Sequence, residues 1–183
     1  MDITKTYCHY VEKLDDANVH RIYHDTEYGF PLKSDDQLFG RLILEINQAG
    51  LSWETILKKK DNFSKAYDRF EIVKVADYDD DDKNRLLNDK GIIRNRLKVD
   101  AAIYNAQVIL NLQKEYGSFR EWLDHHHPLS KKQWVKLFKN TFKFTGGEIT
   151  NEFLMSTGYL KGAHHASCPI HHKIMALKPK WNE

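Results

Sequence analysis

Glu45 and Trp53 flank a predicted turn, and together they could bind a flat heteroaromatic ring. Apolar residues at helical spacing precede the turn, and Glu45 falls at the edge of their stripe. Gly50 is expected to end this helix, and Ser52 to cap a second helix that begins with Trp53. An indole provides a stacking face, and a carboxylate accepts hydrogen bonds from an exocyclic amine. A solvated glutamate and a core tryptophan would give the same pattern, so both interpretations stay open at this point.

The stretch 141–147 could bind a phosphate. Gly146 and Gly147 open a predicted helix, whose N-terminus offers free N–H groups and the positive end of its dipole. Lys139 and Lys143 add positive charge beside it. In physical outline this is an anion site, and an ordinary corner between two helices is the other interpretation.

Charge is distributed unevenly, although a formal net charge of +2 does not by itself indicate a nucleic-acid-binding protein. Acidic residues gather in 77–82, ahead of a predicted helix whose N-terminal dipole favours acids. Lysines gather later in the chain, at Lys131, Lys132, Lys136, Lys139 and Lys143. The sequence therefore allows a local basic face.

Helical periodicity accounts for most of the chain, so we predict an all-α fold. The first 33 residues are expected to be mostly irregular, with one short helical piece at 16–24. A capping box from Ser34 to Gln37 is expected to open the helix that carries Glu45, and another from Ser118 to Glu121 to open a short helix. Further helices are expected at 52–59, 61–68, 79–88, 93–116, 130–140 and 147–157, with a helical turn favoured over an extended piece at 73–76. The tail, 170–183, shows no pattern and could be irregular.

Length and composition indicate one compact domain over 1–183. A chain of 183 residues with 41% hydrophobic content is long enough for a substantial core, and it contains no internal repeat or low-complexity linker. No apolar run approaches a membrane span, and the N-terminus lacks signal-peptide character. We therefore expect a soluble cytoplasmic protein without a membrane partner. Two cysteines in a reducing compartment do not indicate a disulfide.

The longest predicted helix, 93–116, is expected to be the buried central helix. Its apolar positions include Leu97, Ala101, Tyr104, Val108 and Leu112 on one face, widened by Val99, Ile103, Ala106 and Leu110. Its first turns carry Arg94, Arg96 and Lys98, which oppose the helix dipole. An anion nearby, either a carboxylate of the acidic segment or a DNA phosphate, would explain these cations.

Four motifs follow one another along the chain. They are Tyr23-His24-Asp25-Thr26-Glu27-Tyr28-Gly29, Leu44-Glu45-x-x-Gln48-Ala49-Gly50-Leu51-Ser52-Trp53, Gly91-Ile92-Ile93-Arg94 and Phe142-Lys143-Phe144-Thr145-Gly146. Together they resemble the type I 3-methyladenine DNA glycosylases, and the resemblance extends from about Cys8 to Cys168. It implies an all-α domain with a helix-hairpin-helix element. It also implies an enzyme that flips 3-methyladenine out of alkylated DNA and hydrolyses its N-glycosidic bond, leaving an abasic site for base excision repair.

The resemblance assigns the base pocket to Glu45, Tyr23 and Trp53. An anionic acceptor with aromatic faces suits 3-methyladenine, which is a cation in DNA. Tyr28 stands where some relatives carry a tryptophan, so aromatic character is kept there. His20 stands where some members carry a tyrosine, which puts one pocket contact in doubt.

Glu45 is the leading catalytic carboxylate, and Asp25 and Glu27 are second choices. Many glycosylases of the wider superfamily place an aspartate beyond the hairpin, but the stretch 158–183 of this sequence contains none. Whether Glu45 orients water or only recognises the base stays open.

By the same resemblance, two segments contact double-stranded DNA. The loop 48–52 probes the duplex, with Gly50 at its turn and Leu51 as the candidate wedge, although a core leucine is the alternative interpretation for Leu51. The hairpin holds the DNA backbone through Lys143, Thr145, Gly146 and Gly147 without sequence preference.

Cys8, His24, His164 and Cys168 together match the zinc ligands of this family. A Cys2His2 set fills the tetrahedral coordination of one zinc ion, so the site would be structural and would join the N- and C-terminal segments. His9, His165, His171 and His172 could substitute for the histidine ligands, and free thiols with surface histidines are the alternative.

Other classes of protein fit the sequence less well. Neither the His-Glu-x-x-His motif of zinc proteases nor the His-x-Glu and Pro-Cys-x-x-Cys motifs of deaminases occurs. A helical DNA-damage-binding protein without catalysis remains as the alternative function. We expect the glycosylase to act as a monomer.

Overall fold

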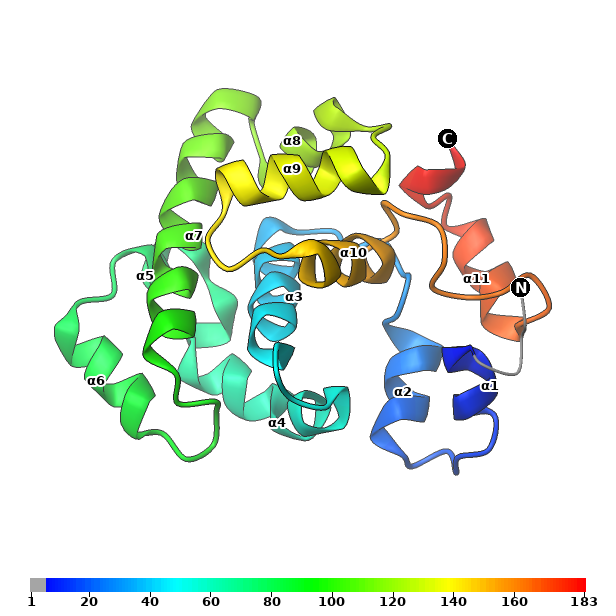
Figure 1. Ribbon diagram of the computed structural model, residues 1–183, viewed down its shortest axis with the longest axis horizontal. Coiled ribbons are helices and arrows are strands. Elements are labelled where there is room, and N and C mark those ends of the chain that lie inside the picture. The colour runs from blue at the N-terminus through cyan, green and yellow to red at the C-terminus, as the bar shows by residue number, and fades with distance from the viewer. Residues whose placement is uncertain (1–5) are drawn as a thin grey trace. The chain divides into compact units, whose positions relative to one another are not determined.

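The computed structural model describes residues 6–183, and every regular element within them is a helix (Figure 1). This confirms the predicted all-α class. The described chain forms two compact units, one of residues 33–150 and one that combines 6–32 with 151–183. The expectation of one domain over 1–183 stays a prediction. No helix in the described part of the chain is long and apolar enough to cross a membrane.

The larger unit, 33–150, contains most of the helices. They are α3 Asp35–Gln48, α4 Trp53–Ala66, the 3-10 helix η2 Asp68–Phe70, α5 Ile72–Ala76, α6 Asp80–Asn88, α7 Arg96–Tyr116, α8 Phe119–His126, α9 Lys131–Thr141 and the beginning of α10 Gly147–Ser156. The longest of them, α7, packs against α3, α5, α6 and α8. Its predicted central place is therefore confirmed within this unit.

The start and the buried stripe of α7 differ from the predictions. The helix begins at Arg96 because the side chain of Asn95 caps it by accepting a hydrogen bond from a backbone N–H of the first turn. Ala106 is fully buried, as expected, but Leu97 is 67% exposed and Tyr104 is 37% exposed. A helix that packs against four neighbours is apolar on several sides, so its periodicity alone did not identify the buried stripe.

The two helices expected at 52–59 and 61–68 are a single helix, α4. Ile56 and Phe63, seven positions apart, are both fully buried. They therefore share one face, which continues across the polar residues between them. The helical turn expected at 73–76 is confirmed as part of α5.

The first turn of α3 is capped by its own residues and supplies a cap for α8. Ser34 and Gln37 form the predicted capping box. The carboxylate of Asp35 also accepts hydrogen bonds from the backbone N–H groups of Phe119 at 2.7 Å and Arg120 at 3.1 Å. These groups open α8, where the helix dipole favours an anion. One side chain at the start of α3 thus also orders the start of α8.

The smaller unit contains the end of α10 and four short helices, α1 Tyr7–Val11, α2 Val19–Thr26, α11 Pro169–Ala176 and the 3-10 helix η3 Lys180–Asn182. The first 33 residues are therefore more regular than expected, and the tail 170–183 is largely helical. Ile170 and Ile174 of α11 are buried in one cluster with Cys8 and Cys168. Tertiary packing stabilises these helices, which are too short to stand out by periodicity.

We expect Asp35→Ala to lower the free energy of unfolding by about 2 kcal/mol, because two N–H groups of α8 lose a charged acceptor. Asp61→Ala, at an exposed position of α4, is the control for removal of an aspartate. Urea denaturation followed by circular dichroism gives both values. Equal stability of the two variants would contradict the cap.

Candidate functional site

The connection from α3 to α4 is a short exposed turn, as the sequence predicted. Gly50 has a φ of +82°, a conformation that side chains disfavour, and the N–H of Leu51 donates to the carbonyl of Gln48 at 2.8 Å. Ser52 then caps α4 by accepting a hydrogen bond from the N–H of Thr55 at 3.2 Å. The Leu51 side chain is 39% exposed. The turn therefore presents a large apolar side chain to solvent.

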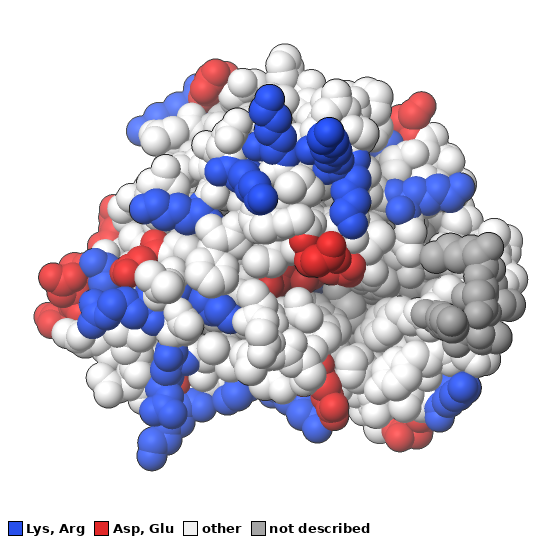
Figure 2. All heavy atoms as spheres, viewed as in Figure 1, with Lys and Arg blue, Asp and Glu red and all other residues white. Residues whose placement is uncertain are grey.

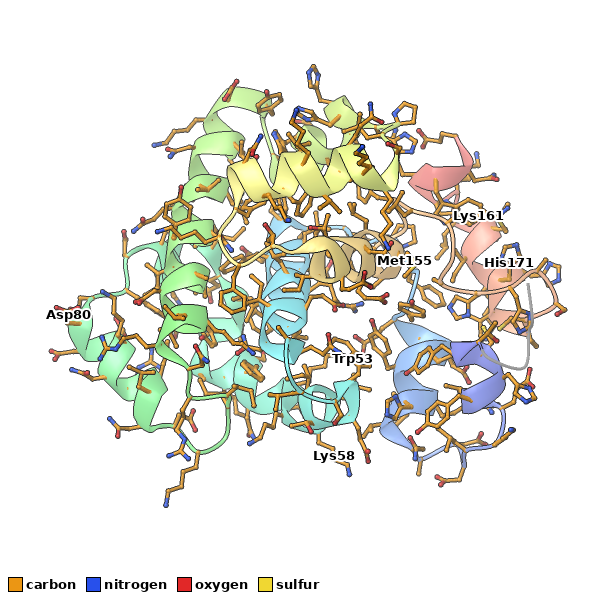
Figure 3. The ribbon with its side chains drawn as sticks, in the orientation of Figure 1. Trp53, Lys58, Asp80, Met155, Lys161 and His171 are labelled. Atoms are coloured by element: carbon orange, nitrogen blue, oxygen red, sulfur yellow. The ribbon has the colours of Figure 1, made fainter. Side chains whose placement is uncertain are left out.

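Glu45 and Trp53 lie on either side of this turn. Glu45 is in the last four residues of α3 and is only 3% exposed. Trp53 is the first residue of α4 and is partly buried (Figure 3). A carboxylate that is buried near the C-terminal end of a helix dipole is costly to keep charged without compensation. A charged Glu45 therefore needs positive or hydrogen-bond-donating groups around it.

Lys98 of α7 holds the end of α3. Its ammonium group donates hydrogen bonds to the carbonyl oxygens of Asn47 at 2.9 Å and Ala49 at 2.7 Å. The Lys98 side chain is buried, and this burial lowers its pKa. The expected anion near Lys98 is thus replaced by carbonyl groups at the negative end of a helix. Arg94 and Arg96 are both exposed at the start of the same segment.

The loop between α9 and α10 is held by two buried side chains. Asn105, with no exposed surface, donates to the carbonyl of Lys143 at 3.1 Å and accepts from its N–H at 2.8 Å. Thr145 is also buried, and its hydroxyl lies within hydrogen-bonding distance of the carbonyls of Phe138 at 2.9 Å and Phe142 at 3.1 Å. These contacts fix the loop from inside the unit.

The outer side of this loop is open. A Cβ atom added at Gly146 or Gly147 would meet no atom within 4 Å. The ammonium group of Lys143 lies 4.0 Å from the centre of the Tyr104 ring. A hollow of about 400 Å³ adjoins the loop and is lined by Lys139, Phe142, Phe144, Thr145, Gly146 and Ile149. Free space around paired glycines at a helix N-terminus leaves room for an anion to approach the backbone.

Positive side chains gather near the same loop. Figure 2 shows Lys and Arg side chains over α9, which contains Lys131, Lys132, Lys136 and Lys139. All four are exposed. Acidic side chains gather on α6, whose first turn contains Asp80, Asp81 and Asp82 (Figure 2). The net charge is near zero, but the surface over α9 is basic. Such a surface suits the binding of a polyanion.

In the smaller unit, Tyr23, Tyr28 and His20 form part of an aromatic cluster. The rings of Tyr23 and Tyr28 have centroids 5.5 Å apart, and Tyr28 donates a hydrogen bond to a carboxylate oxygen of Glu152 at 3.2 Å. The hydroxyl of Tyr7 lies 2.9 Å from Nδ1 of His20. Burial of Tyr7, with a smaller effect of a neighbouring tyrosine, raises its pKa. Tyr7 was not identified from the sequence, because only the three-dimensional structure brings it to His20.

The smaller unit also contains a cluster that could hold a metal ion. Cys8, His24, His164 and Cys168 are buried, and one ligand atom from each lies within 4.8 Å of the others. Nδ1 of His164 lies 3.6 Å from Sγ of Cys8 and 3.5 Å from Sγ of Cys168, and Nε2 of His24 lies 3.8 Å from Sγ of Cys168. Tetrahedral zinc with ordinary bond lengths places sulfur and nitrogen ligands about 3.6 Å apart. The sequence-predicted ligand set is therefore brought together in a suitable geometry.

Each histidine of the cluster is oriented by a hydrogen bond at its other ring nitrogen. Nδ1 of His24 lies 2.6 Å from a carboxylate oxygen of Asp25, and Nε2 of His164 lies 2.7 Å from the carbonyl of Tyr28. Such contacts fix the tautomer that presents the remaining nitrogen to a metal. Burial lowers the pKa of His164 to about 4, which keeps its imidazole neutral as metal binding requires.

Comparison with known proteins agrees with this arrangement. Residues 13–134 match the methyladenine glycosylase family. The DNA-3-methyladenine glycosylase 1 of Escherichia coli is 35% identical, with 80% of this chain and 88% of that protein covered. The DNA-3-methyladenine glycosylase of Haemophilus influenzae is 31% identical, with 80% and 89% covered. The structure of 3-methyladenine DNA glycosylase I from Staphylococcus aureus has a TM-score of 0.76 at 33% identity, over 85% of this chain and 93% of that one.

The helical fold and these relatives place the protein in the class of DNA glycosylases. Within that class, the chain belongs to the methyladenine glycosylase family, and in it to the type I 3-methyladenine enzymes.

We expect Cys168→Ser to lose most of its bound metal and to unfold at a lower temperature than the unchanged protein, because a buried ligand of the Cys2His2 cluster is removed. His172→Ala, at an exposed histidine of the same unit, is the control and should keep both. Metal content by mass spectrometry and melting by circular dichroism measure the two effects. Unchanged metal content in Cys168→Ser would contradict the assignment.

Proposed function

We propose that this chain flips 3-methyladenine out of alkylated double-stranded DNA and hydrolyses its N-glycosidic bond, which leaves an abasic site for base excision repair. The family and the named activities of its relatives support this function. The observation that carries the proposal is the burial of Glu45 at the end of the helix that leads into the exposed Leu51 turn. A buried carboxylate beside a turn that can enter a duplex suits a flipped, positively charged base.

The chemistry of the lesion explains why few groups are needed. Methylation at a ring nitrogen gives the base a positive charge, so the base leaves as a neutral molecule when the N-glycosidic bond breaks. The electron pair of that bond goes to the base, and water adds to the sugar carbon and releases a proton. Because the base is already a good leaving group, the protein has to supply only those interactions that become stronger in the transition state.

The proposed role of Glu45 in this reaction is electrostatic. It attracts the cationic base in a site with little water, where charge interactions are stronger than in bulk solvent. As the bond breaks, the positive charge moves from the base to the sugar, and a carboxylate near both stabilises it throughout. Trp53 supplies an aromatic face for the ring at the start of α4. Neutral adenine gains less from both residues.

Asp25 has a structural role in the smaller unit. Its two carboxylate oxygens are occupied, one by the ring of His24 and the other by Nε of Arg21 at 2.9 Å. Burial alone would raise the pKa of Asp25, but hydrogen bonds from His24 and Arg21 outweigh this and lower it. Asp25 therefore orients a ligand of the metal cluster.

Tyr23, Tyr28 and His20 are proposed to contact the base. The rings of Tyr23 and Tyr28 pack at a tilt of 35°, and Tyr28 is also held by its hydrogen bond to Glu152. His20 replaces a tyrosine of some relatives, yet it keeps a ring and a polar atom, which pairs with Tyr7. These residues would provide stacking and hydrogen bonding for a purine.

The duplex is proposed to be held by the loop between α9 and α10 and opened by Leu51. Backbone N–H groups at Gly146 and Gly147 would bind a phosphate, with Lys143 nearby, while buried Thr145 supports the loop from within. Leu51 would fill the space that the flipped base leaves in the stack.

One zinc ion is proposed for the Cys2His2 cluster. Two thiolates and two imidazoles satisfy tetrahedral zinc without an open position, so the ion would stabilise the smaller unit and take no part in hydrolysis. A monomer acting on chromosomal DNA in the cytoplasm completes the proposal.

We expect Glu45→Gln to release 3-methyladenine from methylated duplex DNA at least about a hundredfold more slowly, because the amide no longer stabilises the positive charge. Affinity for undamaged duplex should stay within about twofold, since the basic surface and the loop are unchanged. Glu54→Gln removes the same charge from the first turn of α4 and should keep full activity. Chromatography of the released base measures the rates.

Full activity of Glu45→Gln would remove Glu45 from the mechanism. No base release by the unchanged protein, together with tight binding of damaged DNA, would favour a DNA-damage-binding protein without catalysis.

A further inference from the structure

α7 contacts both of the loops to which DNA contacts are assigned. At one end, Lys98 donates hydrogen bonds to the carbonyls of Asn47 at 2.9 Å and Ala49 at 2.7 Å, directly before the Gly50 turn. The same ammonium group lies 6.0 Å from the centre of the Phe144 ring, in the loop between α9 and α10. Lys98 is only 5% exposed. One buried cation therefore lies beside the base-probing turn and the phosphate-binding loop.

Asn105 of α7 contacts the loop between α9 and α10. It lies seven residues after Lys98, which places it about 10 Å further along the same face of the helix. Its amide pairs in both directions with the backbone of Lys143. The two loops are thus attached to one rigid helix at a fixed separation.

The turn that carries Leu51 is open on its outer side. A Cβ atom added at Gly50 would meet nothing within 4 Å, and Leu51 itself is 39% exposed. The last carbonyl groups of a helix have no partner within that helix. Lys98 satisfies two carbonyls at the end of α3 from inside the unit and leaves the outer side of the turn clear.

We propose that Lys98 is a positioning residue for lesion extrusion. It does not touch the reacting atoms, and it acts by fixing the turn 48–52 relative to the loop between α9 and α10. A turn fixed in advance inserts Leu51 into the base stack without first having to become ordered. The inference rests on the proposed roles of Leu51 and of the loop.

The first test compares Lys98→Met, which keeps the length of the side chain and removes its charge, with Ile109→Val on the same helix. Ile109 is fully buried, so the loss of one methyl group there controls for lost stability. Both are assayed at a temperature where circular dichroism shows them folded. We expect Lys98→Met to lose about tenfold or more in kcat/KM on methylated duplex. Ile109→Val should stay within about twofold.

Two further readouts separate positioning from general damage. Binding of free 3-methyladenine should stay within about twofold in Lys98→Met, because no extrusion is needed. Lys98→Arg keeps a charged donor and should recover part of the loss. If Lys98→Met matches Ile109→Val on duplex, or if it loses free-base affinity as strongly as duplex turnover, the inference is overturned.

A double-mutant cycle with Leu51→Ala tests whether Lys98 acts through Leu51. If Lys98 acts through Leu51, its substitution should cost much less in the Leu51→Ala background than in the unchanged protein. Additive losses would overturn the inference and leave the wedge role of Leu51 intact. Full activity of Leu51→Ala would contradict the wedge role and would overturn the inference together with it.

Discussion

The structure depends on keeping a carboxylate out of water at the C-terminal end of a helix. Glu45 is nearly inaccessible, and the helix dipole at that end disfavours negative charge. A protein keeps such an arrangement only if the surrounding groups hold it in place. Under the proposed function, this carboxylate would distinguish a positively charged alkylated purine from its neutral parent.

The other elements place this helix end and the surfaces around it. Asp35 ties the beginning of α3 to α8, Lys98 of α7 holds its end, and Asn105 fixes the neighbouring hairpin loop. The helices of the smaller unit are too short to be stable alone, so this unit needs another source of stability. The buried cluster of Cys8, His24, His164 and Cys168 would stabilise this unit when a metal is bound.

Local sequence signals predicted much of this structure. The capping box at Ser34, the stop at Gly50 and the cap at Ser52 each depend on a few adjacent residues, and all three are confirmed. Contacts between distant segments were not predictable in the same way. The partners of Lys98 are carbonyl groups of another helix, and the pairing of Tyr7 with His20 depends on how α1 packs on α2. Residue types alone contain no signal for either.

The most direct measurement compares two duplexes that differ only in the charge of the damaged base. Both carry the same 2′-fluoro sugar, which resists hydrolysis; one contains 3-methyladenine, and the other contains its neutral 3-deaza analogue. If Glu45 selects the lesion by charge, the protein should bind the cationic duplex at least about tenfold more tightly, and Glu45→Gln should lose that preference. Equal affinity of the unchanged protein for both duplexes would contradict the account.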